Sequence, residues 1–131
     1  MKRFTSALML LLSNINAQMP VQAPTATVHV YREKHFVGSA VSPTIYIDGT
    51  ALQRLHNGSF FVATVPSGKH MITAGRSEVG LFTDFEPGKH YYFRMDHKNW
   101  AGTAVSGRQP VFLSQMPAEQ AEAEMRKLKQ Q

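Results

Sequence analysis

The sequence predicts an all-β domain: an antiparallel β-sandwich or a flattened barrel of about eight short strands with one C-terminal α-helix. Three observations support this. Hydrophobic and polar residues alternate along several short segments, the pattern of strands with one buried face. Turn-forming pairs rich in glycine, proline and asparagine recur about every eight to twelve residues. The last segment, "PAEQAEAEMRKLKQQ", has the apolar spacing of a helix instead.

The first residues of the chain are set apart from the rest. Lys2 and Arg3 precede the apolar run "FTSALMLLL", and a polar stretch follows that ends in the small residue Ala17. This is the layout of a secretory signal peptide, and its apolar run is too short for a membrane-spanning helix, which needs about twenty residues. We therefore predict a signal peptide at residues 1–17, cleaved after Ala17, and a periplasmic or secreted protein with no stable membrane span. A cut after Ala23 is the alternative, which the following proline disfavours.

The composition narrows the function classes. The chain contains no cysteine, so we expect neither the lipid-bearing cysteine of a bacterial lipoprotein nor a disulfide or thiolate nucleophile. The formal charge of +5 falls to 5 − 2 = +3 when the lysine and arginine of the signal peptide are removed. The remaining cations are scattered along the chain, so nucleic-acid binding is not expected. The length fits one domain, and the sequence leaves the oligomeric state open.

The N-terminal half predicts the first strands. Residues 18–25, "QMPVQAPT", hold two prolines and no periodicity, as in a flexible leader. The β-domain is predicted at residues 26–114 and begins with the alternating segments "ATVHVYRE" and "PTIYIDG". Asp48-Gly49 is typical of a type I′ hairpin turn, which needs positive φ at both central residues. The return strand is "TALQRLH", and Asn57-Gly58 predicts a second tight turn before "SFFVATV". These three strands are expected to form a meander.

Two similar words, "VPSGKH" at residues 65–70 and "EPGKH" at residues 86–90, follow next. A phosphate-binding loop needs a glycine five residues before its glycine-lysine pair and a helix after it. These words have Ala63 and Thr83 at that position, and alternating segments follow them. We therefore predict that both words are turns, the second of type II. The strands beside them are "HMITAGR", "SEVGLFTDFE" and "HYYFRMD".

The C-terminal part predicts one more strand and the helix. The stretch "HKNWAGTAVSGRQP" is expected to be a long hairpin loop or an irregular edge strand, and "VFLSQ" is the last strand. Residues 117–130 are predicted to be helical, because Pro117 suits the first helical position and acidic residues precede basic ones along the segment. This helix is expected to dock on the sheet or to form a frayed tail. Its apolar stripe comprises Ala118, Ala121, Met125 and Leu128.

A sandwich buries alternate residues of its strands, which predicts the core. The predicted core comprises Val28, Val30, Ile45, Ile47, Phe60 or Phe61, Val62, Ile72, Leu81, Phe85, Tyr91 and Phe93.

The order of these segments resembles a known family. A strand ending in "YRE" is followed by "SPTIYIDG", "LHNGSFF", "VPSGKH" and "EPGKHYYF", as in the bacterial domain of unknown function 2846. The resemblance covers residues 25–96 and continues weakly into the terminal helix. It implies an exported small β-domain, often a lipoprotein, and because this chain lacks the lipid-bearing cysteine it implies a soluble form here. A more distant likeness is to PEGA-type β-sandwich domains. Neither resemblance implies a chemistry.

Six histidines are the first candidates for chemistry: His29, His35, His56, His70, His90 and His97. No two have the spacing of a local ligand pair, although adjacent strands could bring His70 and His90 together. Surface or hydrogen-bonded histidines are therefore favoured, and we predict no metal site and no cofactor. The serines lack a Gly-x-Ser-x-Gly motif, and Asp48 and Glu86 lie in turns. We predict no catalytic residues and no enzyme, with a histidine-dependent metal-binding or hydrolytic protein as the alternative.

Aromatic residues are the candidates for a binding role. Strand parity directs Tyr46, Tyr92 and Arg94 away from the core, and Trp100 lies in a glycine-flanked polar stretch. Outward aromatic and arginine side chains are typical of interaction surfaces. The competing interpretation is that the aromatic residues pair across strands and only stabilise the sheet. The sequence therefore predicts an exported binding module whose partner is an envelope protein or a surface polymer.

Overall fold

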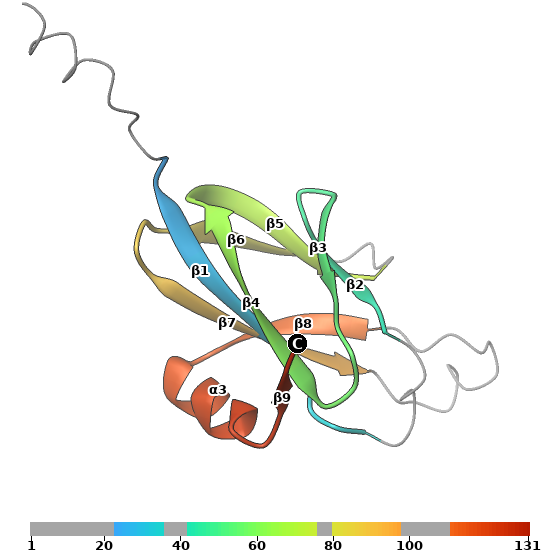
Figure 1. Ribbon diagram of the computed structural model, residues 1–131. Coiled ribbons are helices and arrows are strands. Elements are labelled where there is room, and N and C mark those ends of the chain that lie inside the picture. The colour runs from blue at the N-terminus through green and yellow to red at the C-terminus, as the bar shows by residue number, and fades with distance from the viewer. Residues whose placement is uncertain (1–22, 36–41, 76–79, 98–110) are drawn as a thin grey trace, which may run out of the picture.

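The computed structural model describes residues 23–35, 42–75, 80–97 and 111–131 (Figure 1). The described part of the chain forms nine strands and one helix. In chain order these are β1 (Thr25–Tyr31), β2 (Thr44–Ile47), β3 (Thr50–Arg54), β4 (Ser59–Pro66), β5 (Gly68–Ala74), β6 (Leu81–Phe85), β7 (His90–His97), β8 (Val111–Met116), α3 (Ala118–Met125) and β9 (Lys129–Gln130).

The strands form two open sheets. The first, called sheet A, has the order β8-β7-β1-β4-β9, and the second, called sheet B, has the order β3-β2-β5-β6. The described strands form seven neighbouring pairs. Five pairs are antiparallel, and two pairs, β1 with β7 and β4 with β9, are parallel. The predicted all-β architecture with a C-terminal helix is confirmed, and the described strands close no barrel. The predicted signal peptide and most of the leader lie outside the described residues.

The β2–β3 hairpin forms as predicted, with φ of 49° at Asp48 and 80° at Gly49, as a type I′ turn requires. The predicted meander is wrong, because β4 pairs with β1 in sheet A and not with β3. The Asn57-Gly58 turn explains the difference. The Asn57 side chain exchanges two hydrogen bonds with the backbone of His35, of 2.9 and 2.8 Å. These bonds hold the turn beside the end of β1, so the chain crosses to the other sheet there.

Both Pro-Gly words are turns between the two sheets. The first joins β4 of sheet A to β5 of sheet B, and the second joins β6 of sheet B to β7 of sheet A. Both also hold the beginning of β1. The Ser67 N–H donates to the carbonyl of Pro24 at 3.1 Å, and the Gly88 N–H donates to that of Thr25 at 2.8 Å. Gly88 has a φ of 77°, the positive value that a type II turn needs at its third residue.

The hydrophobic core lies between the sheets. Two residues of the predicted core, Leu81 and Tyr91, are only partly buried against it. The prediction that Val62 lies in the core is wrong, because 43% of its surface is exposed. Phe61 faces inward on β4, so its neighbour Val62 must face outward. The predicted core residues that are buried are Val28, Val30, Ile45, Ile47, Phe61, Ile72, Phe85 and Phe93.

The helix is shorter than predicted and covers part of the outer face of sheet A. It ends at Met125, whereas the sequence predicts helix to residue 130. The last residues instead form β9 beside β4, because the N–H groups of Lys129 and Gln131 donate to the carbonyls of Gly58 and Phe60. Pairing with this sheet edge satisfies backbone groups that a continued helix would leave open. Figure 1 shows α3 lying against the sheet, so the helix docks rather than frays.

Candidate functional site

The outer face of sheet B is open in the described part of the chain. Successive side chains of a strand point to opposite faces of the sheet. Tyr46 therefore points outward, because its neighbours Ile45 and Ile47 are buried. Phe82 also points outward, because Thr83 and Phe85 on the same strand are buried on the inner face. We call this surface the open face. It comprises Tyr46, Lys69, Met71, Thr73, Phe82 and Asp84.

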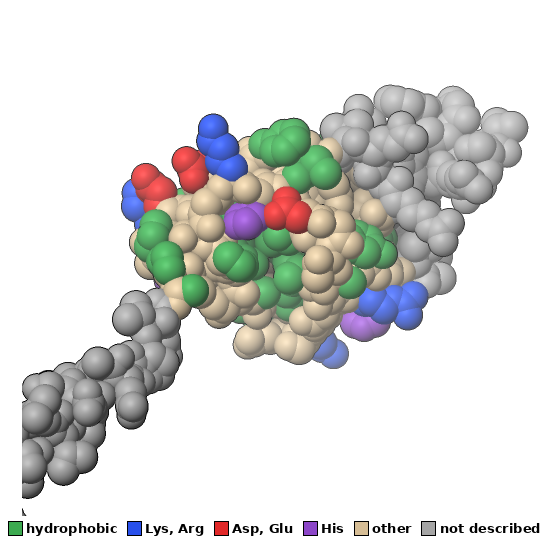
Figure 2. Space-filling model, turned by 90° about the horizontal axis from the view of Figure 1, so that it is seen from above, with side chains coloured by type: hydrophobic (Ala, Val, Ile, Leu, Met, Phe, Trp, Pro, Cys, Tyr) green, Lys and Arg blue, Asp and Glu red, His purple; other side chains and the backbone are tan. Residues whose placement is uncertain are grey.

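The strand register places these side chains next to one another. Tyr46 lies opposite Thr73, and Met71 lies opposite Phe82. Phe82 is 82% exposed, more than the other exposed large hydrophobic residue of the described chain, Val62. Figure 2 shows the molecule from above, where β5 lies in Figure 1: hydrophobic side chains are spread over this side, an acidic side chain and a histidine lie near the centre of the view, and most other charged side chains lie toward its edge. An aromatic group this exposed contributes little to the core and is available for contact.

The edge of β6 is partly blocked by Tyr91. Its hydroxyl accepts a hydrogen bond of 2.7 Å from the Glu86 N–H and donates one of 3.1 Å to the carbonyl of Asp84. These backbone groups are therefore not free to pair with an added strand. The open face offers its side chains, rather than this stretch of edge, as the contact surface.

A cluster of polar side chains links the β2–β3 turn to β5. The Asp48 carboxylate accepts the Met71 N–H at 2.8 Å and lies 2.5 Å from Nδ1 of His70. Nε2 of His70 lies 3.3 Å from the carbonyl of Ser67. The bond to Asp48 raises the pKa of His70, while the Met71 N–H, followed by His70, lowers the pKa of Asp48. With an oxygen at each ring nitrogen, His70 acts as a structural donor and presents no free nitrogen as a general base.

Tyr92 and Arg94, two of the predicted binding residues, lie on the outer face of sheet A beneath α3. The expected exposure of Tyr92 is wrong: it is 7% exposed, and its hydroxyl donates to Oε1 of Glu122 at 3.0 Å. The Arg94 side chain is 24% exposed and reaches Glu124 of the helix, at 3.0 and 3.1 Å. Both residues therefore attach the helix to the sheet.

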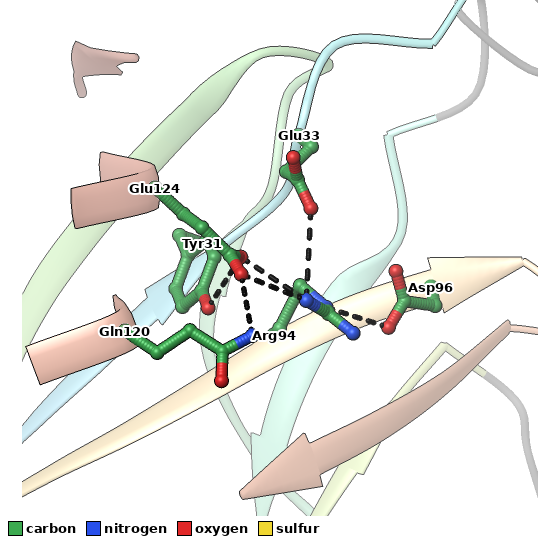
Figure 3. A network of polar contacts seen from close by, with 6 residues as sticks. All are labelled: Tyr31, Glu33, Arg94, Asp96, Gln120 and Glu124. Carbon is green, nitrogen blue, oxygen red and sulfur yellow. Dashed lines mark hydrogen bonds and ion pairs between the residues drawn. The ribbon is translucent and has the colours of Figure 1, made fainter. Parts of the chain in front are cut away.

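Glu124 is the centre of this attachment (Figure 3). It accepts the Tyr31 hydroxyl at 2.9 Å and the Gln120 amide at 2.9 Å in addition to the Arg94 guanidinium. Burial alone would raise the pKa of Glu124, but these three donors lower it below the ordinary value. Burial, and then the bond to Glu124, raise the pKa of the Tyr31 hydroxyl. Asp96 fixes the other side of the guanidinium, with 2.9 Å from Nε of Arg94 to Oδ2.

The four predicted binding residues thus do not form one site. Tyr46 lies on the open face of sheet B, Tyr92 and Arg94 lie on sheet A under the helix, and Trp100 lies outside the described residues. Sequence reasoning missed Phe82. The signal was present, since "LFTDF" places Leu81, Thr83 and Phe85 inward and therefore Phe82 outward.

Adjacent strands do not join the two histidines that the sequence made possible partners, His70 and His90. His90 contacts His29 on the neighbouring strand β1, with 2.9 Å between Nδ1 of His90 and Nε2 of His29, whereas His70 contacts Asp48. The His29 ring stacks on Tyr92 at 4.5 Å. Burial lowers the pKa of His29, the charge of His90 lowers it further, and the charge of Glu122 acts in the opposite sense. The described residues contain no group of three or more histidine or acidic side chains arranged to hold a metal ion.

Comparison with known proteins places the chain in a family. Residues 22–111 match the family described as "Protein of unknown function (DUF2846)". The chain belongs to the DUF2846 family. This confirms the family that the turn words indicate, while the likeness to PEGA-type domains stays a prediction. No curated protein and no solved structure matches the chain. Within the described residues of this DUF2846 domain, no helix is long and apolar enough to span a bilayer.

Proposed function

We propose that this DUF2846 domain is an exported, non-catalytic module that binds another envelope protein through the open face of sheet B. The observation that carries the proposal is Phe82, 82% exposed on a sheet face that no described helix covers. The other sheet uses α3 to cover its outer aromatic residues, Tyr31 and Tyr92. The contrast between the two outer faces supports contact through sheet B.

The composition of the open face favours a protein partner over a polymer. Aromatic residues and methionine are enriched in protein–protein interfaces, and Tyr46, Met71 and Phe82 are of these types. Lys69 and Asp84 face each other across the strands at the rim, one charge of each sign. An anionic envelope polymer would be bound better by a concentration of cations, and Asp84 opposes that.

A non-catalytic role is supported by the arrangement of the most reactive side chains. His70 has an oxygen at each ring nitrogen. Asp48 is held by His70 and a backbone N–H, and Glu86 forms an ion pair with Lys89 at the exposed turn. None of these groups is joined to a serine or threonine hydroxyl in the manner of a nucleophile and base. A histidine and a hydroxyl do meet at the exposed contact of 2.9 Å between Nδ1 of His56 and Oγ of Ser42, but no carboxylate of the described residues is bonded to the His56 ring to orient it.

The proposal is tested by replacing Phe82 with serine. The immobilised Phe82→Ser protein should lose the envelope protein that the wild-type domain retains, with at least about a tenfold loss of affinity for a central aromatic contact. The fold should be unchanged, because the side chain is outside the core. Retention is measured by quantitative mass spectrometry of detergent-solubilised envelope fractions, followed by titration with the purified partner.

Val62→Ser is the matched control, since Val62 is also an exposed hydrophobic residue but lies on sheet A. It should retain the partner as the wild type does. Equal retention by the Phe82 variant, or binding only to purified cell-wall polymer, would remove the open face as a protein-binding site.

Export is the second part of the proposal and has its own test. The basic start, the apolar run and Ala17 support cleavage by a signal peptidase. The processed protein should begin at Gln18 when sequenced from its N-terminus after isolation from the periplasm or medium. Recovery of the intact Met1 form in washed membranes would instead indicate an uncleaved anchor.

A further inference from the structure

The pair of histidines on the outer face of sheet A stands apart from the open face. His29 comes from β1 and His90 from β7, two parallel neighbours in the centre of a five-stranded sheet. The backbone beneath them is fixed, since the Thr27 N–H donates to the carbonyl of Lys89 at 3.0 Å. A site built on two paired strands holds its ligands more precisely than one built on loops.

We propose that His29 and His90 bind a divalent transition-metal ion of the Cu²⁺ or Ni²⁺ type through two imidazole nitrogens. The ligand atoms are Nε2 of His29 and Nδ1 of His90, 2.9 Å apart. Two nitrogens bound at about 2.0–2.1 Å and at right angles to each other are about 2.9 Å apart, whereas tetrahedral ligands are about 3.3 Å apart. The present separation is therefore compatible with two adjacent positions of a tetragonal ion, and copper binds imidazole more strongly than zinc.

The rest of the surroundings suits an open site with two protein ligands. The described residues contain no third histidine or carboxylate that completes a metal cluster, so water fills the other positions. Neutral imidazole ligands favour copper, nickel and zinc over calcium and magnesium, which prefer oxygen. His29 is half-buried and stacked at 14° on Tyr92, and this holds the first ligand in place.

Binding needs a shift of tautomer and a rotation of the exposed His90 ring. Before an ion binds, one ring donates its N–H to the other across the 2.9 Å contact. That proton moves, through water, to the far nitrogen of its own ring, so that both facing nitrogens present lone pairs to the ion. The ring centroids are 5.2 Å apart and the planes are inclined by 31°. The exposed His90 ring can rotate to direct its lone pair at a cation beside the contact.

The test is titration of the processed, tag-free protein with CuCl₂, followed by calorimetry and electron paramagnetic resonance. We expect one Cu²⁺ per chain with two equatorial nitrogen ligands and a higher melting temperature on binding. His29→Gln and His90→Gln should each weaken the site at least about tenfold, because each removes one of its two anchoring ligands. Zn²⁺ should bind more weakly than Cu²⁺.

His56→Gln is the matched control, because His56 is exposed and contacts Ser42 rather than another histidine. It should bind Cu²⁺ as the wild type does. His90 is exposed, so its variant keeps the test valid even if loss of the His29 stacking on Tyr92 disturbs the fold. Unchanged Cu²⁺ affinity in the His90 variant, or equal loss in the His56 variant, would mean that the pair shares a proton and binds no metal.

Discussion

Replacing Tyr92 with alanine should lower the free energy of unfolding by about 3 kcal/mol, as expected for truncation of a buried aromatic residue. Tyr92 is 7% exposed and packs with Tyr31, Ala121 and Met125 between sheet A and α3. Truncation leaves a cavity in this second core and removes the ring on which His29 stacks. Urea unfolding followed by far-UV circular dichroism measures the change.

Tyr92→Phe is the matched variant, because it removes only the hydroxyl that donates to Glu122. It should cost about 1 kcal/mol or less, since solvent can satisfy the carboxylate of the exposed Glu122. A Tyr92→Ala protein with wild-type stability would show that the helix does not depend on this ring. The side chain would then again be a candidate for contact with a partner, as the sequence predicts.

The strand segments and their turns could be predicted from the sequence, because both depend on residues that are close together in the chain. Alternation marks a half-buried strand, and the Asp48-Gly49 pair and Gly88 after Pro87 mark backbone positions with positive φ. The pairing of the strands could not be predicted in this way. Asn57-Gly58 looks the same in a hairpin as in a crossing between sheets, and only its bonds to His35, distant in sequence, distinguish the two.

The candidate site was harder to predict than the fold, because parity gives the direction of a side chain but not what covers it. Tyr46, Tyr92 and Arg94 do point away from the main core. A second layer, α3, covers the last two and leaves the first on an open sheet. Likewise, no local spacing joins His29 to His90, since parallel pairing of β1 with β7 brings together residues that are 61 positions apart.

Replacing Gly88 with valine should destabilise the domain by about 2 kcal/mol, because a β-branched residue resists positive φ. Gly88 has a φ of 77°, and a Cβ built there meets no atom within 4 Å, so the cost measures backbone strain without a clash. The strain acts at a turn that joins the two sheets and whose N–H is bonded to the carbonyl of Thr25 in β1. Thermal and urea unfolding measure the loss.

Lys89→Ala, one residue further on, is the control that separates a structural turn from an anion-binding loop. Lys89 pairs with Glu86 at an exposed turn, and such pairs contribute little to stability. The Lys89 variant should therefore unfold like the wild type and keep its envelope partner, while the Gly88 variant loses stability. The same contrast in stability alone is expected between Lys69→Ala and Gly68→Val, where φ is 113°. If the lysine variants keep the fold but lose affinity for an anionic ligand such as inorganic phosphate, the two Pro-Gly words bind anions, and their glycines serve a binding loop as well as a corner of the sandwich.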